Sequence, residues 1–395
     1  MGTGILVAQN KHSSEQEVKD PTPIPDSSPV SPPRRIPTPT LTPTQQPTKT
    51  PRGKELSTIT IPTPIPTPRS VKNPMETQYS FQAGVNVVFY FQDPEFREKV
   101  IPNLERLMDL HINHISVAFP IYQDGYQSTV VYDHPKNTPK REDIAYFIDE
   151  AHKRGFTITL RPLMDEEAFI PEGNWRGSIQ PTNPQAWFES YKTLITDYAQ
   201  FAEEHNAEFF SIGSEFSTME SFNDEWLALI TNVRSVYTGQ ITYSTNWDPS
   251  WVNFPLSVTP WKKELDFESI DAYFRLNAPD YTTVDRLIAA WQPWIQVITD
   301  SGRSLDSIVF AEIGIIPHLG AHRTPYAWES SAPFDEETQR RFYEATCAVF
   351  SGKLRGIHWW LIDLRLPSDA EFINSFNPLG RSAEQALAAC YANYP

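Results

Sequence analysis

The chain has few of the residues that metal, phosphate and nucleic-acid sites require. It holds two cysteines, Cys347 and Cys390, and no paired-cysteine or HExxH motif, and its nine histidines do not cluster as metal ligands would. Its 16 glycines form no phosphate-binding loop. Basic residues number 33 against 49 acidic ones, a net charge of −16, which argues against sequence-independent binding to nucleic acid. No apolar run reaches the ~18 residues of a membrane-spanning helix.

Two further chemistries are disfavoured by the local sequence. Ser214 and Ser217 flank Glu215 and do not form the Gly-x-Ser-x-Gly pattern of a serine hydrolase. The acidic run at 165–167 has the composition of a divalent-cation site, but consecutive acids after a strand are more often a solvated loop. We therefore expect neither a metal nor a cofactor.

Proline is abundant, and its distribution divides the chain. Of the 36 prolines, 16 lie between Pro21 and Pro74, in a segment nearly free of aromatic residues. Such a Pro/Thr-rich segment cannot bury a core, so residues 1–78 are predicted to be a disordered linker and residues 79–395 one globular domain. The first 78 residues carry nine basic and six acidic side chains, a net of +3, which leaves −16 − 3 = −19 for the domain.

From residue 82 onward, short apolar runs alternate with amphipathic stretches. The runs predict strands at 83–89, 114–121, 156–163, 208–215, 240–246, 267–274, 308–313 and 356–363. The stretches predict helices at 94–111, 138–155, 184–206, 224–239, 284–302, 335–352 and 382–393, with only a short turn at 261–265 between the fifth and sixth strands. Eight such units predict a single (β/α)8 TIM barrel of the α/β class, with a doubly wound open sheet as the alternative.

One helix and the cysteines allow more detailed predictions. Thr138 is expected to cap the helix at 138–155, with Pro139 at its first position and Gly155 at its end. Cys347 and Cys390 both fall in helical patterns near the end of the chain. A disulfide between neighbouring helices is compatible with this placement, but we favour two buried free thiols.

Two carboxylates are distinguished by their positions at strand ends. Glu215 ends the fourth run and Glu312 ends the seventh, and active sites of barrels lie at the carboxyl ends of the strands. Glycoside hydrolysis needs two facing carboxyl groups, one to protonate the leaving oxygen and one to attack the anomeric carbon or activate water. The alternative is that each Glu caps a helix or forms an ion pair.

Tryptophan placement also favours a sugar ligand, because flat indoles pack against the apolar faces of sugar rings. Six tryptophans fall in or beside expected loops on the same side of the barrel as the two Glu: Trp175, Trp247, Trp251, Trp328, Trp359 and Trp360. The tryptophans in helical patterns are assigned to packing: Trp187, Trp226, Trp291 and Trp294.

Five short motifs at strand ends carry a family resemblance. They are, in order, IGSEF (212–216), YSTNW (243–247), IDAYF (270–274), AEIG (311–314) and WW (359–360). This set resembles glycoside hydrolase family 113, the β-mannanases of clan A, whose fold is a (β/α)8 barrel. The likeness covers residues 82–392 and leaves the proline-rich segment outside.

The resemblance implies a retaining double displacement, with Glu215 as acid/base and Glu312 as nucleophile. It implies that Tyr273 hydrogen-bonds the nucleophile, and that Trp359 or Trp360 forms the floor under the sugar being cleaved. Further substrate contacts are implied for Arg161, Asn246 and Trp247. Ser214 stands where many clan members have an Asn that binds the sugar 2-hydroxyl, which leaves discrimination between mannose and glucose open.

The expected activity is therefore that of a secreted retaining endo-β-1,4-mannanase. The alternatives are a clan-A hydrolase of another β-glycan (glucan, xylan or galactan) and a barrel that binds polysaccharide without cleaving it. The expected partner is a polysaccharide or oligosaccharide, and the protein is expected to be a monomer. The apolar stretch at 5–8 is shorter than a signal-peptide core, but the Pro/Thr-rich linker resembles the spacers of secreted bacterial hydrolases, so we expect a secreted or cell-surface location.

Overall fold

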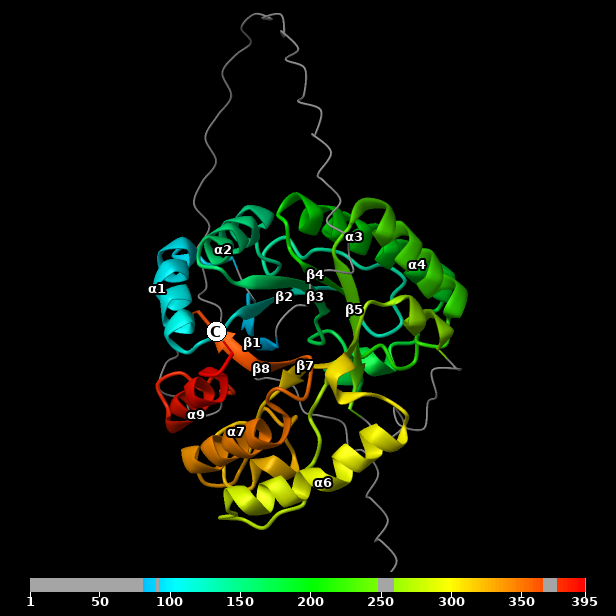
Figure 1. Ribbon diagram of the computed structural model, residues 1–395. Coiled ribbons are helices and arrows are strands. Elements are labelled where there is room, and N and C mark those ends of the chain that lie inside the picture. Colours follow the sequence, from blue (N-terminus) through cyan, green and yellow to red (C-terminus); the bar gives the residue numbers. More distant parts are fainter. Residues whose placement is uncertain (1–80, 90–91, 248–258, 365–374, 395) are drawn as a thin grey trace, which may run out of the picture.

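In the computed structural model, which describes residues 81–89, 92–247, 259–364 and 375–394, eight parallel strands close into a barrel in chain order. Strand β8 pairs with β1, so the sheet has no free edge, and the predicted barrel is confirmed over the open-sheet alternative. Helices surround the strands on the outside (Figure 1). Across the described residues, no helix combines the length and apolar character that crossing a membrane demands.

The strands agree closely with the sequence prediction. They are β1 (Gln82–Val88), β2 (His114–Ile121), β3 (Thr157–Met164), β4 (Phe209–Ser214), β5 (Gln240–Asn246), β6 (Glu268–Asp271), β7 (Ile308–Ile313) and β8 (Gly356–Asp363). Strand β6 is shorter than the predicted 267–274, because the amide of Tyr273 donates to the carbonyl of Asp271 and turns the chain out of the sheet.

The helices follow the predicted stretches, with their ends shifted by a few residues. They are α1 (Phe96–Asp109), α2 (Arg141–Lys153), α3 (Pro184–Glu204), α4 (Asn223–Val236), α6 (Val284–Asp300), α7 (Glu336–Phe350) and α9 (Ser382–Tyr391). Short 3₁₀ turns occur at η1 (Ile170–Glu172), η2 (Arg176–Ser178), η3 (Pro260–Glu264), η4 (Leu305–Ser307) and η5 (Ala321–Arg323). The turn predicted at 261–265 is η3, and its fully buried Trp261 stacks on Trp226 of α4 with ring centroids 4.6 Å apart.

The predicted cap of α2 is wrong. The helix begins at Arg141 after Lys140, which makes no side-chain cap. The hydroxyl of Thr138 instead donates to the carbonyl of Pro120 at 2.9 Å and accepts from the amide of His134 at 2.9 Å. Thr138 therefore joins the end of β2 to the following loop, a tertiary contact that competes successfully with the local capping role.

The two cysteines form a disulfide, so the favoured prediction of free thiols is wrong. Cys347 lies in α7 and Cys390 in α9, and their Cα atoms are 5.6 Å apart. Figure 1 shows α9 lying beside α7 near the point where β8 closes onto β1. Helical periodicity placed each cysteine on a helix, but the pairing depends on how two helices separated by β8 pack against each other.

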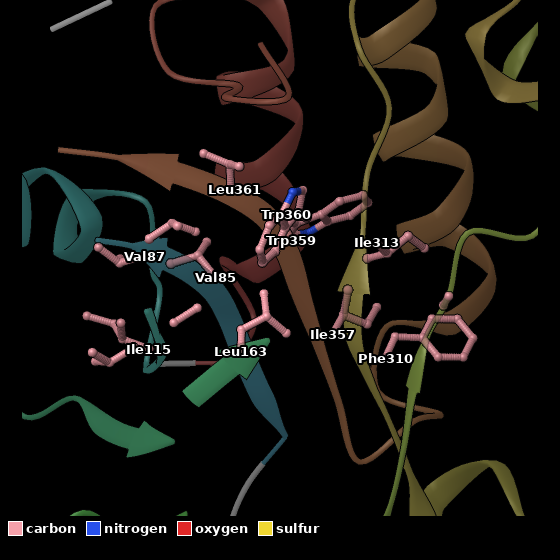
Figure 2. Close-up of a cluster of buried hydrophobic side chains, with 14 of the residues drawn as sticks. Val85, Val87, Ile115, Leu163, Phe310, Ile313, Ile357, Trp359, Trp360 and Leu361 are labelled. Atoms are coloured by element: carbon pink, nitrogen blue, oxygen red, sulfur yellow. The ribbon is translucent and has the colours of Figure 1, made fainter. Parts of the chain in front are cut away.

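The hydrophobic core lies between the strands and the surrounding helices. Figure 2 shows its side chains where the barrel closes, including Val85 of β1, Ile115 of β2 and Ile357 of β8, all fully buried. The helix tryptophans at 187, 226 and 291 are fully buried, as predicted. The core also contains a polar pair, because the imidazoles of His114 and His358 stack with centroids 4.4 Å apart.

Candidate active site

Three of the strand-end residues lie in register along one edge of the barrel. In the pairing of β5 with β6, Asn246 is opposite Asp271, and in the pairing of β6 with β7, Asp271 is opposite Glu312. The register shifts near the ends of β4, β6 and β7, and such irregularities re-aim the side chains beside them. The topology therefore brings together residues from separate motifs, as the barrel prediction requires.

Glu215 directly follows β4 in a strained backbone conformation. Its φ of 57° lies in the left-handed region that residues other than glycine seldom adopt. The surrounding structure holds it there, because the amide of Glu215 donates to the carbonyl of Ser244 at 2.8 Å and the next amide, of Phe216, donates to the Tyr243 hydroxyl at 2.7 Å. Strain of this kind costs about 1–3 kcal/mol and occurs preferentially at functional sites.

The Glu215 carboxyl is nearly buried and has one neutral hydrogen-bond donor. The Nδ2 of Asn246 donates to its Oε1 at 2.7 Å. Burial, followed by the negative charge of Asp271, raises the pKa of Glu215 well above its usual value. A carboxyl whose pKa is raised holds its proton more tightly, which suits the role of a general acid.

The Glu312 carboxyl has a contrasting environment, in which one oxygen accepts a hydrogen bond and the other lies in an ion pair. The hydroxyl of Tyr273 donates to Oε2 at 2.8 Å, the contact that the resemblance implied. A guanidinium nitrogen of Arg161 lies 2.7 Å from Oε1. A hydroxyl donor and a guanidinium cation therefore hold this carboxyl in position, as an attacking nucleophile requires.

Arg161 lies beneath the carboxylates and is only 1% exposed. Its Nη2 contacts both oxygens of Asp271 at 2.9 Å and the hydroxyl of Ser214 at 3.0 Å. Its Nη1 donates to Asn86 Oδ1 at 3.2 Å. Arg161 and Ser214 were expected to contact substrate, but the structure places both in this buried layer, where they support the carboxylates.

Asp271 belongs to the same buried layer and was not assigned a role from the sequence. Burial raises its pKa to about 7, although the Arg161 cation acts in the opposite direction. Its position at the end of β6, within the IDAYF motif, was the available sequence signal. Its contact with Arg161, 110 residues away, was not visible in the sequence.

A second arginine lies beside the carboxyl of Glu215. Arg176, in the loop between β3 and α3, has its Nε 3.8 Å from Glu215 Oε2 and 2.6 Å from Glu166 Oε1. The sequence singles out neither Arg176 nor Glu166, and the acidic run at 165–167 was predicted to be a solvated loop. Glu166 is instead half-buried and forms an ion pair within the site.

The paired tryptophans of β8 point in opposite directions, as consecutive residues of a strand do. Trp359 is fully buried and stacks on Tyr343 of α7 with centroids 3.7 Å apart, so it does not reach the site. Trp360 packs edge-on against Trp328, and Trp328 contacts Phe376, which in turn contacts Tyr273, the partner of Glu312. Of the two indoles, both labelled in Figure 2, Trp360 is 2% exposed and lies on the side of Tyr273, and its role as the floor under the sugar stays a prediction.

The remaining candidate aromatics pack against residues of the surrounding loops and helices. Trp247 is half-buried and stacks on Tyr326 from the β7–α7 loop, with centroids 5.8 Å apart, and its edge meets Trp294 of α6. Trp175 is half-buried and covers Gly177, where a Cβ would lie 2.3 Å from the indole. The predicted platform residue Trp251 lies outside the described residues.

Comparison with known proteins agrees with this geometry. The model of glycoside hydrolase family 113 matches residues 90–374. A solved structure described as the family 113 β-mannanase AaManA from Alicyclobacillus acidocaldarius, in complex with ManMIm, is 22% identical, with a TM-score of 0.67 over 80% of this chain and 98% of that one. Another, described as a family 113 β-1,4-mannanase, is 23% identical, with a TM-score of 0.67 over 80% and 99% of the two chains.

These structural similarities establish the fold, and the family match establishes the membership. A comparison with curated protein sequences finds no significant match. The family match spans well over half of the chain and includes both Glu215 and Glu312. The chain therefore belongs to glycoside hydrolase family 113 and is a glycoside hydrolase.

Proposed function

We propose that the protein is a retaining endo-β-1,4-mannanase that uses Glu215 as acid/base and Glu312 as nucleophile. The observation that carries the proposal is the contrast between the two carboxyls. Glu312 accepts a hydrogen bond from Tyr273 and forms an ion pair with Arg161, whereas burial and the Asp271 charge raise the pKa of Glu215. Double displacement at a glycosidic bond requires one carboxyl that donates a proton and one that attacks as a nucleophile, and these different surroundings suit the two roles.

In the first step, the Glu312 carboxylate attacks the anomeric carbon while Glu215 transfers its proton to the departing glycosidic oxygen. The sugar is then joined to Glu312 by an ester bond, and the leaving chain departs as an alcohol. In the second step, Glu215, now ionised, takes a proton from water, whose oxygen attacks the anomeric carbon and releases Glu312 as a carboxylate. Tyr273 and Arg161 hold Glu312 in place throughout.

The choice of mannan rests on the solved relatives, which are described as β-mannanases. Recognition of the sugar 2-hydroxyl separates mannose from glucose, and the hydroxyl of Ser214, where many clan members have an Asn, is 2% exposed and accepts from Arg161. Asn246 supplies a neutral amide next to Glu215, the candidate acid/base. A hydrolase of another β-glycan therefore remains the second candidate function.

The test is reducing-end release by the full chain from β-mannan, glucomannan, xylan and β-glucan, with a Glu312→Ala variant as the control. We expect release from the two mannans that disappears in the control. Release mainly from xylan or β-glucan would support the second candidate. Proton NMR of the first product identifies the stereochemistry: the β-anomer supports double displacement, and the α-anomer contradicts it.

We further propose that the enzyme works outside the cytosol. The Cys347–Cys390 disulfide supports this location, because such bonds persist in oxidising compartments and are rare in the cytosol. The Pro/Thr-rich linker predicted for residues 1–78 is a suitable spacer for an exported catalytic domain. Immunoblots of fractionated source cells test the proposal, and detection of the protein only in the cytosolic fraction would contradict it.

A further inference from the structure

The loop between β3 and α3 places a cation next to the acid/base candidate. Arg176 is the first residue of η2, and its side chain is 15% exposed. Its Nε lies 3.8 Å from Oε2 of Glu215, the carboxyl oxygen that does not accept from Asn246. Glu215 therefore has a neutral amide on one oxygen and a guanidinium near the other.

Glu166 holds this guanidinium in position. Its Oε1 accepts from both the backbone amide of Arg176, at 3.1 Å, and the Nε of Arg176, at 2.6 Å. The same loop segment is closed by a reciprocal pair, in which the amide of Trp175 donates to Ser178 Oγ at 3.0 Å and the Ser178 amide donates to the Trp175 carbonyl at 2.9 Å. Backbone and side chain of Arg176 are thus both tied to one carboxylate, so the cation is preorganised.

One nitrogen of the same guanidinium is available to donate a further hydrogen bond. The Nη1 of Arg176 is buried and has no hydrogen-bond partner among the residues that the structure describes. An unpaired buried donor is unfavourable, and a group that appears during function is one of the explanations for keeping it. Glu215 becomes such a group when it gives its proton to the leaving oxygen and turns into a carboxylate.

We propose that Arg176 is a positioning residue that stabilises the ionised form of Glu215 between the two half-reactions, and that Glu166 limits the charge it exerts there. The inference rests on the proposed function, because it assigns Glu215 the acid/base role. Arg176 acts mainly in the second step, in which Glu215 must be ionised so that it accepts a proton from water. Glu166 acts in the first step, because without its negative charge the Arg176 cation would favour loss of the Glu215 proton before the leaving oxygen accepts it.

Arg176 and Glu166 have opposite effects on the pKa of Glu215. Burial and Asp271 raise the pKa of Glu215, Arg176 lowers it, and Glu312 and Glu166 raise it again. Among the described residues, the charged or titratable groups that act on Glu215 are Arg161 from β3, Glu166 and Arg176 from the β3–α3 loop, Asp271 and Tyr273 from β6 and the turn after it, and Glu312 from β7. Two of these groups, Glu166 and Arg176, lie in one loop and act in opposite directions, which makes a paired test possible.

The test compares the full chain with Arg176→Met, Arg176→Lys and Glu166→Gln. The basic limb of the kcat/KM profile on β-mannan reports the acid/base group of the free enzyme. Removing a cation at this distance raises a carboxyl pKa by ~1 pH unit or more, so Arg176→Met should move the limb to higher pH and lower kcat. Glu166→Gln should move it to lower pH, and Arg176→Lys should lie between Arg176→Met and the unaltered chain.

A second readout needs no turnover. Carbon-13 NMR titration of the Glu215 carboxyl, assigned by its loss in Glu215→Gln, is measured in the inactive Glu312→Gln background with and without Arg176→Met and Glu166→Gln. The same opposite shifts are expected. If the unaltered chain cleaves none of the glycans, the proposed function fails while this titration still tests Arg176.

A purely structural role for the loop gives a different result. Arg176→Met and Glu166→Gln would then lower activity equally at every pH, and neither the basic limb nor the NMR titration would move. Either this outcome or shifts of the same sign in the two variants overturns the inference. Should Arg176→Met fail to fold, Arg176→Lys and Glu166→Gln retain the paired comparison.

Discussion

Removing the disulfide between α7 and α9 should destabilise the barrel at the place where it closes. The double variant Cys347→Ser/Cys390→Ser frees a segment of 43 residues that contains β8, the strand that pairs with β1. In the chain-entropy description, closing a loop of this length removes about 13 cal/mol/K from the unfolded chain, which is worth about 4 kcal/mol at 25 °C. Because a domain of about 300 residues unfolds with an entropy near 0.6 kcal/mol/K, the melting temperature should fall by about 6 °C.

Calorimetry and urea unfolding measure the effect, on the unaltered chain with and without reductant and on the double variant. The reduced chain and the variant should unfold alike, and both at a lower urea concentration than the oxidised chain. Mass spectrometry after alkylation in denaturant provides the control, because the oxidised chain should take up no alkyl group. Uptake of two groups, or equal unfolding midpoints for all three samples, would refute the reasoning.

Three further predictions concern the carboxyls and the buried histidines. Glu215→Ala should lower kcat on β-mannan by ~10²–10⁴-fold. The loss should be far smaller on an aryl β-mannoside, because its leaving group needs no proton. Equal losses on both substrates would argue against the acid/base role. Tyr273→Phe removes a hydrogen bond of ~1.5–3 kcal/mol to Glu312. The value of kcat/KM should therefore fall about 10- to 150-fold, with little change in the unfolding midpoint. A loss below about threefold in kcat/KM would contradict this prediction. Burial lowers the pKa of His114 to about 3 and that of His358 well below its usual value. The folded chain therefore binds fewer protons than the unfolded one below about pH 6.5, and the free energy of unfolding falls as the pH decreases, by up to ~1.4 kcal/mol per pH unit for each group. In urea titrations of His114→Gln, the free energy of unfolding should change less with pH between about pH 6.5 and pH 4.5 than it does in the unaltered chain. An equal change with pH in the two proteins would show that the His114 imidazole is not its cause.

The strand-end rule is sufficient to locate the two central residues of the site in the sequence. Glu215 and Glu312 end apolar runs, and in a parallel barrel every such end meets at the same rim. Asn246 and Tyr273 follow from the same rule and contact the two carboxyls. Local sequence carries this information because burial on both sides gives each barrel strand a continuous apolar run that is easily recognised.

The rule identifies the rim but does not separate a residue that faces the cleft from one that lies beneath it. Arg161 and Ser214 were expected to touch substrate, and they are buried under the carboxylates. Trp359 was an alternative to Trp360 and points away from the site, onto α7. A shift of one residue reverses the direction of a strand side chain, and the register irregularities near the strand ends make that direction unreadable from sequence spacing alone.

The sequence by itself determined the barrel, the order of its elements and the two carboxyls, because apolar periodicity and strand-end position are properties of short segments. Only the tertiary structure decided which partners those carboxyls have. Glu215 meets Arg176 from a loop, Glu312 meets Arg161 across the barrel, and Cys347 meets Cys390 beyond β8. Each of these contacts joins residues that lie tens of positions apart, and each forms only when barrel closure brings separate strands, loops and helices together.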